Sequence, residues 1–133
     1  IVTIAANAYP ARLVAQSMLG KKSQAYLYQF SRRPDTAKAR KLGAFHGVDL
    51  AYVFGTLTKK EGYDTADSQL AAAMTAYWTN FAKTGNPNGS GLPDWPAYAK
   101  QSERILNLDT PIKVIEHPSI KECNWLYQQA TKR

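Results

Sequence analysis

His46 lies between two glycines, Gly43 and Gly47, in the segment GAFHGVDLAYVFG. A neutral imidazole near pH 7 can take a proton from a hydroxyl and later return it to a leaving group. The flanking glycines let the backbone turn sharply, so a loop can project the ring toward another element. This pattern fits a general base, but it also fits a turn or core histidine, and spacing alone does not choose between them.

The remaining histidine and the single cysteine are predicted to be structural. His117 precedes Pro118 near the end of a predicted strand. Cys123 has no second cysteine with which to pair, and it falls in an apolar pattern typical of a core thiol. Zinc sites usually show close ligand pairs, which His46, His117 and Cys123 do not form. We therefore expect no metal and no cofactor.

The elements around His46 are predicted to alternate between helix and strand. Pro10 falls in the first turn of a short helix. Residues 25–30 are apolar on both alternating faces apart from one glutamine, as in a strand of a mostly parallel sheet. The basic segment 31–41 is predicted to be a loop. Residues 48–54 are predicted to form a short buried helix, with Asp49 near its positive N-terminus.

The second half of the chain continues this alternation, so the fold class is predicted to be α/β. Apolar residues at helical spacing from Leu70 to Phe81 predict an amphipathic helix that opens near residues 65–67 and ends at Gly85. The further predicted elements are a surface loop at 86–96, strands at 104–108 and 112–116, and a closing helix after a capping pattern of Ser119 and Glu122.

Four ordered segments resemble the type-B carboxylesterase and cholinesterase family. GAFHGVDLAYVFG resembles the family's histidine motif, in which His46 takes the place of the catalytic histidine and Asp49 that of a following acidic residue. The other matching segments are YWTNFAKTGNPN at 77–88, WPAY at 95–98, and Cys123 with Trp125. Ile4 and Asn7 depart from the family, whose members usually carry an acidic and an aromatic residue there, and Asp49 replaces a more frequent glutamate.

The resemblance implies an α/β-hydrolase fold and a serine carboxylesterase activity on small-molecule carboxylic esters. Residues 1–133 would be the C-terminal segment of a single catalytic domain, with distal strands of the central sheet and their flanking helices. By the same resemblance His46 would deprotonate a serine, protonate the departing alcohol and then activate water.

The nucleophile that this chemistry needs is absent from the sequence. In α/β-hydrolases the chain order is Ser, then Asp or Glu, then His, with the serine in a G-x-S-x-G elbow. No such elbow occurs here. Ser17, Ser23 and Ser31 precede His46 without it, and Asp35 has no motif support as the acid. We therefore expect the partner to be the remaining N-terminal part of the same enzyme, and the chain alone to be inactive.

Two other function classes stay open. The formal net charge is +7, and Arg32, Arg33, Lys38, Arg40 and Lys41 cluster beside the aromatic residues of YLYQF, as in some modules that bind single-stranded nucleic acid. Because those aromatics are expected to be buried, a solvated basic loop without a nucleic-acid partner is the default interpretation. A non-catalytic member of the same family, acting in adhesion, is the second alternative.

Composition indicates a soluble chain with a real core. The hydrophobic fraction is 44% and the aromatic fraction 11%. No apolar run approaches the roughly 18 residues that a membrane-spanning helix requires. We therefore expect no membrane span.

Overall fold

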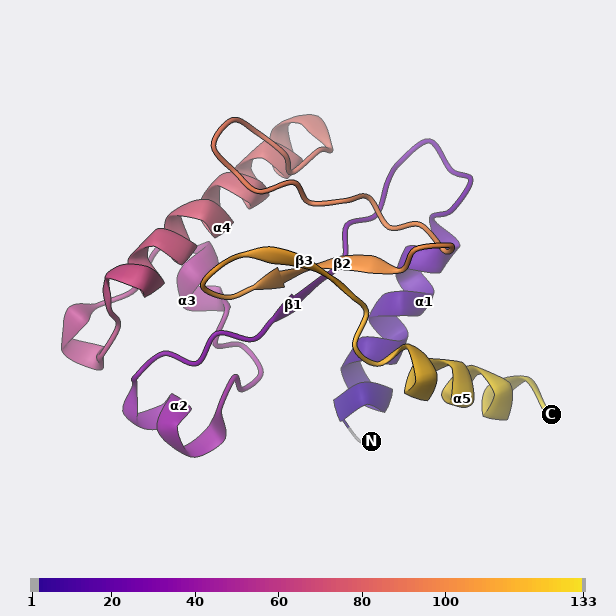
Figure 1. The fold of residues 1–133 in the computed structure, drawn as a ribbon, viewed down its shortest axis with the longest axis horizontal. Helices are drawn as coiled ribbons and strands as arrows, with labels where there is room; N and C mark the ends of the chain where they lie inside the picture. Colours follow the sequence, from indigo (N-terminus) through magenta and orange to yellow (C-terminus); the bar gives the residue numbers. More distant parts are fainter. Residues whose placement is uncertain (1–2, 133) are drawn as a thin grey trace. The chain divides into compact units, whose positions relative to one another are not determined.

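The computed structural model describes residues 3–132, which form helices and one three-stranded sheet (Figure 1). Strand β1 pairs in parallel with β2, with Tyr28 opposite Leu106 and Phe30 opposite Leu108, and β3 lies on the other side of β2. The predicted α/β alternation is thus present. In chain order the elements are η1 (Ile4–Ala8), α1 (Tyr9–Ser17), β1 (Tyr28–Phe30), α2 (Ala37–Leu42), α3 (Leu50–Val53), η2 (Lys59–Glu61), α4 (Thr65–Thr84), β2 (Arg104–Leu108), β3 (Lys113–Glu116) and α5 (Ile120–Thr131).

The chain divides into two compact units. The terminal unit comprises the described residues of Ile1–Leu27, Pro96–Ile105 and Ile115–Arg133, and the central unit comprises Tyr28–Trp95 and Leu106–Val114. His46 belongs to the central unit. Across residues 3–132, the helices are all too short or too polar to cross a membrane.

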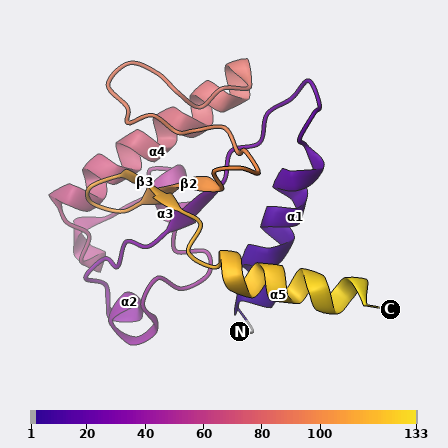
Figure 2. The ribbon, with the colours of Figure 1, turned by 45° about the vertical axis from the view of Figure 1, so that its right-hand side comes forward.

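The terminal unit is built from η1, α1 and α5, and α5 passes close to η1 (Figure 2). Pro10 lies in the first turn of α1, as predicted. α5 begins after Ser119, but the Ser119 side chain makes no capping hydrogen bond, so the predicted capping box is wrong. An N-cap side chain reaches the N2 or N3 amide from an extended backbone, whereas Ser119 has φ −113° and ψ 28°.

The central unit is organised by α4, the 20-residue helix that the apolar periodicity predicts. Asp64 and Asp67 form a reciprocal capping box at its start, and Gly85 ends it with a left-handed φ of +75°. The buried face of α4 carries Leu70, Met74 and Tyr77. The ring of the adjacent Trp78 lies 5.2 Å from that of Tyr28 on β1, in an edge-to-face arrangement. These contacts pack α4 onto the start of the sheet.

Three local predictions need correction. The predicted strand at 25–30 is hydrogen-bonded as a strand only at β1. The loop at 31–41 contains the start of α2, because the Thr36 hydroxyl accepts a hydrogen bond from the Ala39 amide at 3.1 Å and caps that helix. The buried helix at 48–54 is shorter, and Leu50 and Phe54 are 56% and 73% exposed. A single helical turn can place only one side, here that of Tyr52, against α4.

Two leucine-to-alanine substitutions should separate core from surface in the central unit. Leu70 on α4 is 2% exposed, so Leu70→Ala should lower the free energy of unfolding by about 2–5 kcal/mol through lost burial and a cavity. Leu50→Ala, the matched exposed change on α3, should cost about 0.5 kcal/mol or less in this chain. Urea denaturation followed by tryptophan fluorescence measures both, and equal losses would contradict this description of the core.

Candidate functional site

His46 lies in the turn that joins α2 to α3. Gly43 and Gly47 have φ of +67° and +84°, a region that favours glycine, so the predicted need for sharp turning on both sides is confirmed. The His46 side chain is exposed, and within residues 3–132 it makes no hydrogen bond or ion pair. The ring is therefore available to a group outside the described residues.

The helix that follows His46 is tied to two neighbouring elements. The Asp49 carboxylate accepts a hydrogen bond from the Tyr28 hydroxyl of β1 at 2.9 Å. The Tyr52 hydroxyl donates to Asp67 Oδ1 on α4 at 2.7 Å, and the Thr75 hydroxyl donates to the Val53 carbonyl at 3.1 Å. The Asp49 carboxylate thus binds Tyr28 on β1 and makes no capping hydrogen bond to the amides of α3. Burial and the neighbouring Asp49 carboxylate raise the pKa of Tyr28, which keeps its hydroxyl a donor.

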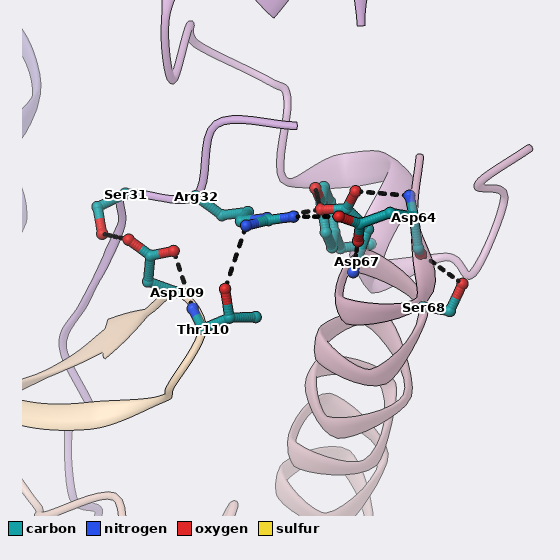
Figure 3. Close-up of polar contacts among 8 residues, drawn as sticks. Ser31, Arg32, Asp64, Asp67, Ser68, Asp109 and Thr110 are labelled. Carbon is teal, nitrogen blue, oxygen red and sulfur yellow. Dashed lines mark hydrogen bonds and ion pairs between the residues drawn. The ribbon is translucent and has the colours of Figure 1, made fainter. Parts of the chain in front are cut away.

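Asp67 is the centre of a buried polar network, in which Arg32 reaches from the end of β1 toward α4 (Figure 3). Arg32 Nε donates to Asp67 Oδ1 at 2.7 Å, and Arg32 Nη2 donates to Asp64 Oδ2 at 3.1 Å. The Asp64 amide donates to Asp67 Oδ2 at 2.9 Å. Burial alone would raise the pKa of Asp67, but the donors of Arg32, Asp64 and Tyr52 hold it below its ordinary value of 3.8. Asp67 is therefore a buried anion with satisfied oxygens.

Sequence reasoning missed this network and treated Arg32 as part of a solvated basic loop. That interpretation is wrong, because the Arg32 side chain is only 19% exposed and is paired with Asp67. The sequence does contain a signal for this buried charge, on the apolar face of α4. Asp67, Leu70 and Met74 recur at the spacing of one helix face, so the apolar face of α4 begins with a carboxylate. A buried carboxylate requires a cation or several donors.

Ser17, Ser31 and Asp35, which precede His46, are engaged in local structure. Ser31 donates bifurcated hydrogen bonds to Asn107 Oδ1 at 2.9 Å and Asp109 Oδ2 at 2.8 Å. Ser17 donates to the Val14 carbonyl within its own helix. Asp35 is exposed and pairs with Arg40 at 2.6 Å, a surface ion pair of little energetic weight. These contacts agree with the structural roles that the sequence assigns to them.

The basic segment offers fewer free cations than its composition suggests. Arg32 and Arg40 are paired with carboxylates, and Lys38 Nζ lies 4.1 Å from the centroid of the Phe45 ring. The Phe30 ring of β1 packs edge-to-face on Tyr52 at 5.0 Å. A stacking platform for bases needs an exposed ring face, so this arrangement favours the structural interpretation.

His117 and Cys123 belong to the terminal unit and are buried there, which confirms the predicted core position of Cys123 and agrees with a structural role for His117. His117 Nδ1 accepts from the Ser119 amide at 3.2 Å, and the His117 amide donates to the Glu103 carbonyl at 3.0 Å. Glu103 in turn forms a bidentate ion pair with the buried Arg12. Burial lowers the pKa of His117, Glu103 opposes that shift, and Arg12 adds to it. Burial likewise raises the pKa of the Cys123 thiol.

Within residues 3–132, His, Cys, Asp and Glu side chains nowhere gather in groups of three or more suited to a metal ion. What the His46 region offers chemically is therefore an exposed imidazole on an anchored turn. Proton transfer to or from a hydroxyl brought to that ring is the chemistry that it can perform.

Comparison with known proteins identifies relatives across nearly the whole chain. The model of the carboxylesterase family matches residues 1–126. Carboxylesterase 4A of Bos taurus is 43% identical over 91 residues, which are 67% of this chain and 16% of that protein. Carboxylesterase 1C of Mus musculus is 36% identical over 95 residues, which are 69% of this chain and 17% of the relative. Carboxylesterase 1D of Mus musculus is 32% identical over 119 residues, covering 87% of this chain and 21% of its own length. The chain thus spans about a fifth or less of each of these relatives.

The buried His117 should make the terminal unit sensitive to acid. The ordinary pKa of 6.5 is lowered in the folded state, so the unfolded state takes up more protons as pH falls through 6.5, and stability falls with it. Glu103, whose pKa the Arg12 ion pair holds below 4.5, loses its stabilising contribution only at lower pH. His117→Gln should therefore flatten the dependence of unfolding free energy on pH between about 7 and 5.

Urea denaturation followed by circular dichroism at several pH values in that range measures the slope. Gln128→Ala, an exposed uncharged change on α5 of the same unit, is the control and should leave the slope as it is. A slope that His117→Gln does not change would contradict the buried neutral state of His117.

Proposed function

Because this chain belongs to the carboxylesterase family, we propose that it supplies the triad histidine of a serine carboxylesterase, with His46 as general base. One observation carries the proposal. The His46 ring is exposed on a glycine-flanked turn whose following helix is anchored to β1 and α4, and its nitrogens have no partner among residues 3–132. A general base needs this combination of a fixed backbone and a free ring.

The reaction proposed for the complete enzyme is hydrolysis of a carboxylic ester in two steps. His46 Nε2 takes the proton of a serine hydroxyl as its oxygen attacks the ester carbonyl, and the imidazolium then protonates the departing alcohol. The ring next takes a proton from water, whose oxygen attacks the acyl-serine and releases the acid and the free serine. A carboxylate on Nδ1 would hold the ring in the required tautomer. Neither the serine elbow nor the acid motif occurs in residues 1–133, so both are assigned to another part of the enzyme.

We further propose that residues 1–133 form the C-terminal segment of one α/β-hydrolase domain and pack against the remainder of that domain. The small share of each relative that the chain spans supports a larger domain, and the C-terminal position rests on the chain order of the triad, in which the histidine comes last. The surface around His46 supports it too, because Leu42, Leu50 and Phe54 are exposed on the elements that border the His46 turn. Large apolar side chains grouped in this way usually mark a surface that another polypeptide covers.

The isolated chain should show no saturable ester hydrolysis that depends on His46. Without a serine nucleophile the acyl-enzyme cannot form, and only the slow background of a free imidazole remains. Turnover of p-nitrophenyl acetate by the 133-residue chain should therefore show no saturation and should exceed that of its His46→Gln variant by no more than this slow background. Saturable turnover that His46→Gln abolishes would place a complete site in this chain.

A chimaera tests the positive side of the proposal. The segment of bovine carboxylesterase 4A that aligns with this chain is replaced by residues 1–133, and serine reactivity is verified with a fluorophosphonate probe. His46→Gln should then lower kcat by about four to six powers of ten, because the triad acts as a unit. Asp35→Asn, an exposed change in the same unit, is the matched control and should leave kcat as it is. A chimaera that keeps its kcat after His46→Gln would assign the base to another residue.

A further inference from the structure

The turn that carries His46 has two backbone hydrogen bonds within residues 43–48 and one buried side chain, that of Val48, which is 5% exposed. The His46 side chain makes no hydrogen bond within residues 3–132, and both glycines of the turn add backbone freedom. Gly43 at one end donates its amide to Ala39 and so closes α2. At the other end the turn runs directly into α3 through Asp49. The position of the imidazole therefore depends on these local contacts and on how firmly α3, which follows directly, is held.

A helix of four residues is not stable by itself, since forming one turn fixes several dihedral angles for one or two hydrogen bonds. Its stability must come from neighbours. Tyr28 of β1 holds its first end through Asp49, and Thr75 of α4 holds its last carbonyl. Tyr52, the only residue of α3 that is fully buried, lies between these two ties and reaches Asp67.

Asp67 connects this helix back to the sheet. The same oxygen, Oδ1, accepts from both Tyr52 and Arg32, and Arg32 follows two residues after the end of β1. The contacts thus form a closed ring. It runs from β1 through Arg32 to Asp67, from Asp67 through Tyr52 to α3, and from Asp49 through Tyr28 to β1 again.

From this closed loop of hydrogen bonds we infer that Tyr52 and Asp67 are positioning residues for His46, acting through α3 and without contact to the reacting atoms. The inference rests on the proposed role of His46. The Tyr52 hydroxyl is the single link between α3 and the buried carboxylate, while the ring of Tyr52 packs separately against Phe30 at 5.0 Å and Tyr63 at 5.8 Å. Tyr52→Phe therefore opens the hydrogen-bonded ring while keeping the aromatic packing.

The first experiment measures the backbone dynamics of the chain by ¹⁵N relaxation. In the parent protein the amides of residues 43–49 should have order parameters near about 0.85, as in rigid backbone. In Tyr52→Phe they should fall toward about 0.6, while the amides of the second half of α4 keep their values. Tyr127→Phe, an exposed tyrosine on α5, is the matched control and should change neither set. Unchanged order parameters at 43–49 in Tyr52→Phe, or an equal drop in Tyr127→Phe, overturn the inference.

A second variant keeps the test decisive if Tyr52→Phe does not fold. Thr75→Val is nearly isosteric at an exposed position, and it removes the hydrogen bonds of the hydroxyl to the Val53 carbonyl at 3.1 Å and the Tyr52 carbonyl at 3.4 Å. The order parameters of residues 43–49 should fall in this variant as well, and unchanged values overturn the inference.

The chimaera separates positioning from the function on which it rests. Tyr52→Phe should lower kcat by roughly 10- to 100-fold and change KM by less than about threefold, because a displaced base slows chemistry more than it weakens binding. An unchanged kcat in a chimaera that His46→Gln inactivates overturns the positioning role. If His46→Gln leaves the chimaera active, the proposed function fails. The relaxation measurement then still decides whether the closed loop of hydrogen bonds through Tyr52 and Asp67 holds the turn.

Discussion

The buried carboxylate of Asp67 is the constraint on which the central unit depends. An ionised carboxylate in an apolar interior is costly unless it is paired and hydrogen-bonded, and removing one partner of a buried pair typically costs about 3–5 kcal/mol. Asp67 meets this requirement with donors from three elements: the guanidinium of Arg32 after β1, the phenol of Tyr52 on α3, and the Asp64 amide at the start of α4. Satisfying one charge therefore fixes how a strand end and two helices lie relative to one another.

The terminal unit solves a similar problem with different chemistry. Arg12 and Glu103 are both buried and pair in the bidentate geometry that suits a guanidinium and a carboxylate. Glu103 adopts a positive φ of 43°, unusual for a residue with a side chain, and its carbonyl accepts from the His117 amide. Each unit thus uses a buried ion pair to hold segments that lie far apart in the sequence. The two pairs differ in their surroundings, because only the pair in the terminal unit lies beside a buried histidine, His117.

The sequence predicts well those features that depend on local periodicity or a local motif. α4 follows from the spacing of Leu70, Met74 and Tyr77, and its ends follow from the acidic residues before it and Gly85 after it. β2 and β3 follow from two apolar runs around a turn. α2 was missed because its six residues, AKARKL, are half basic and too few to show an apolar periodicity, and Thr36 alone starts the helix. The extent of burial at 48–54 was overestimated, since composition does not tell which side of a one-turn helix meets a neighbour. The pairing of Arg32 with Asp67 joins residues 35 positions apart, and no period in the chain encodes it.

The same reasoning explains how the histidine motif can be recognised from sequence while its chemistry stays incomplete within this chain. Glycines around His46 and apolar residues after it are local features, so they are visible as a pattern. The contacts that would orient the ring are long-range, and the described residues supply only those that fix the backbone beneath it. Anchoring of the turn and orientation of the imidazole are therefore separate tasks. We infer that Asp67, Tyr52 and Asp49 perform the first inside the central unit, and the second requires a hydrogen-bond acceptor on Nδ1 that residues 3–132 do not bring to the ring. In the role proposed for His46, a base that is anchored before it is oriented suits a site completed by a second part of the fold, because docking then has to align one side chain and not a mobile loop.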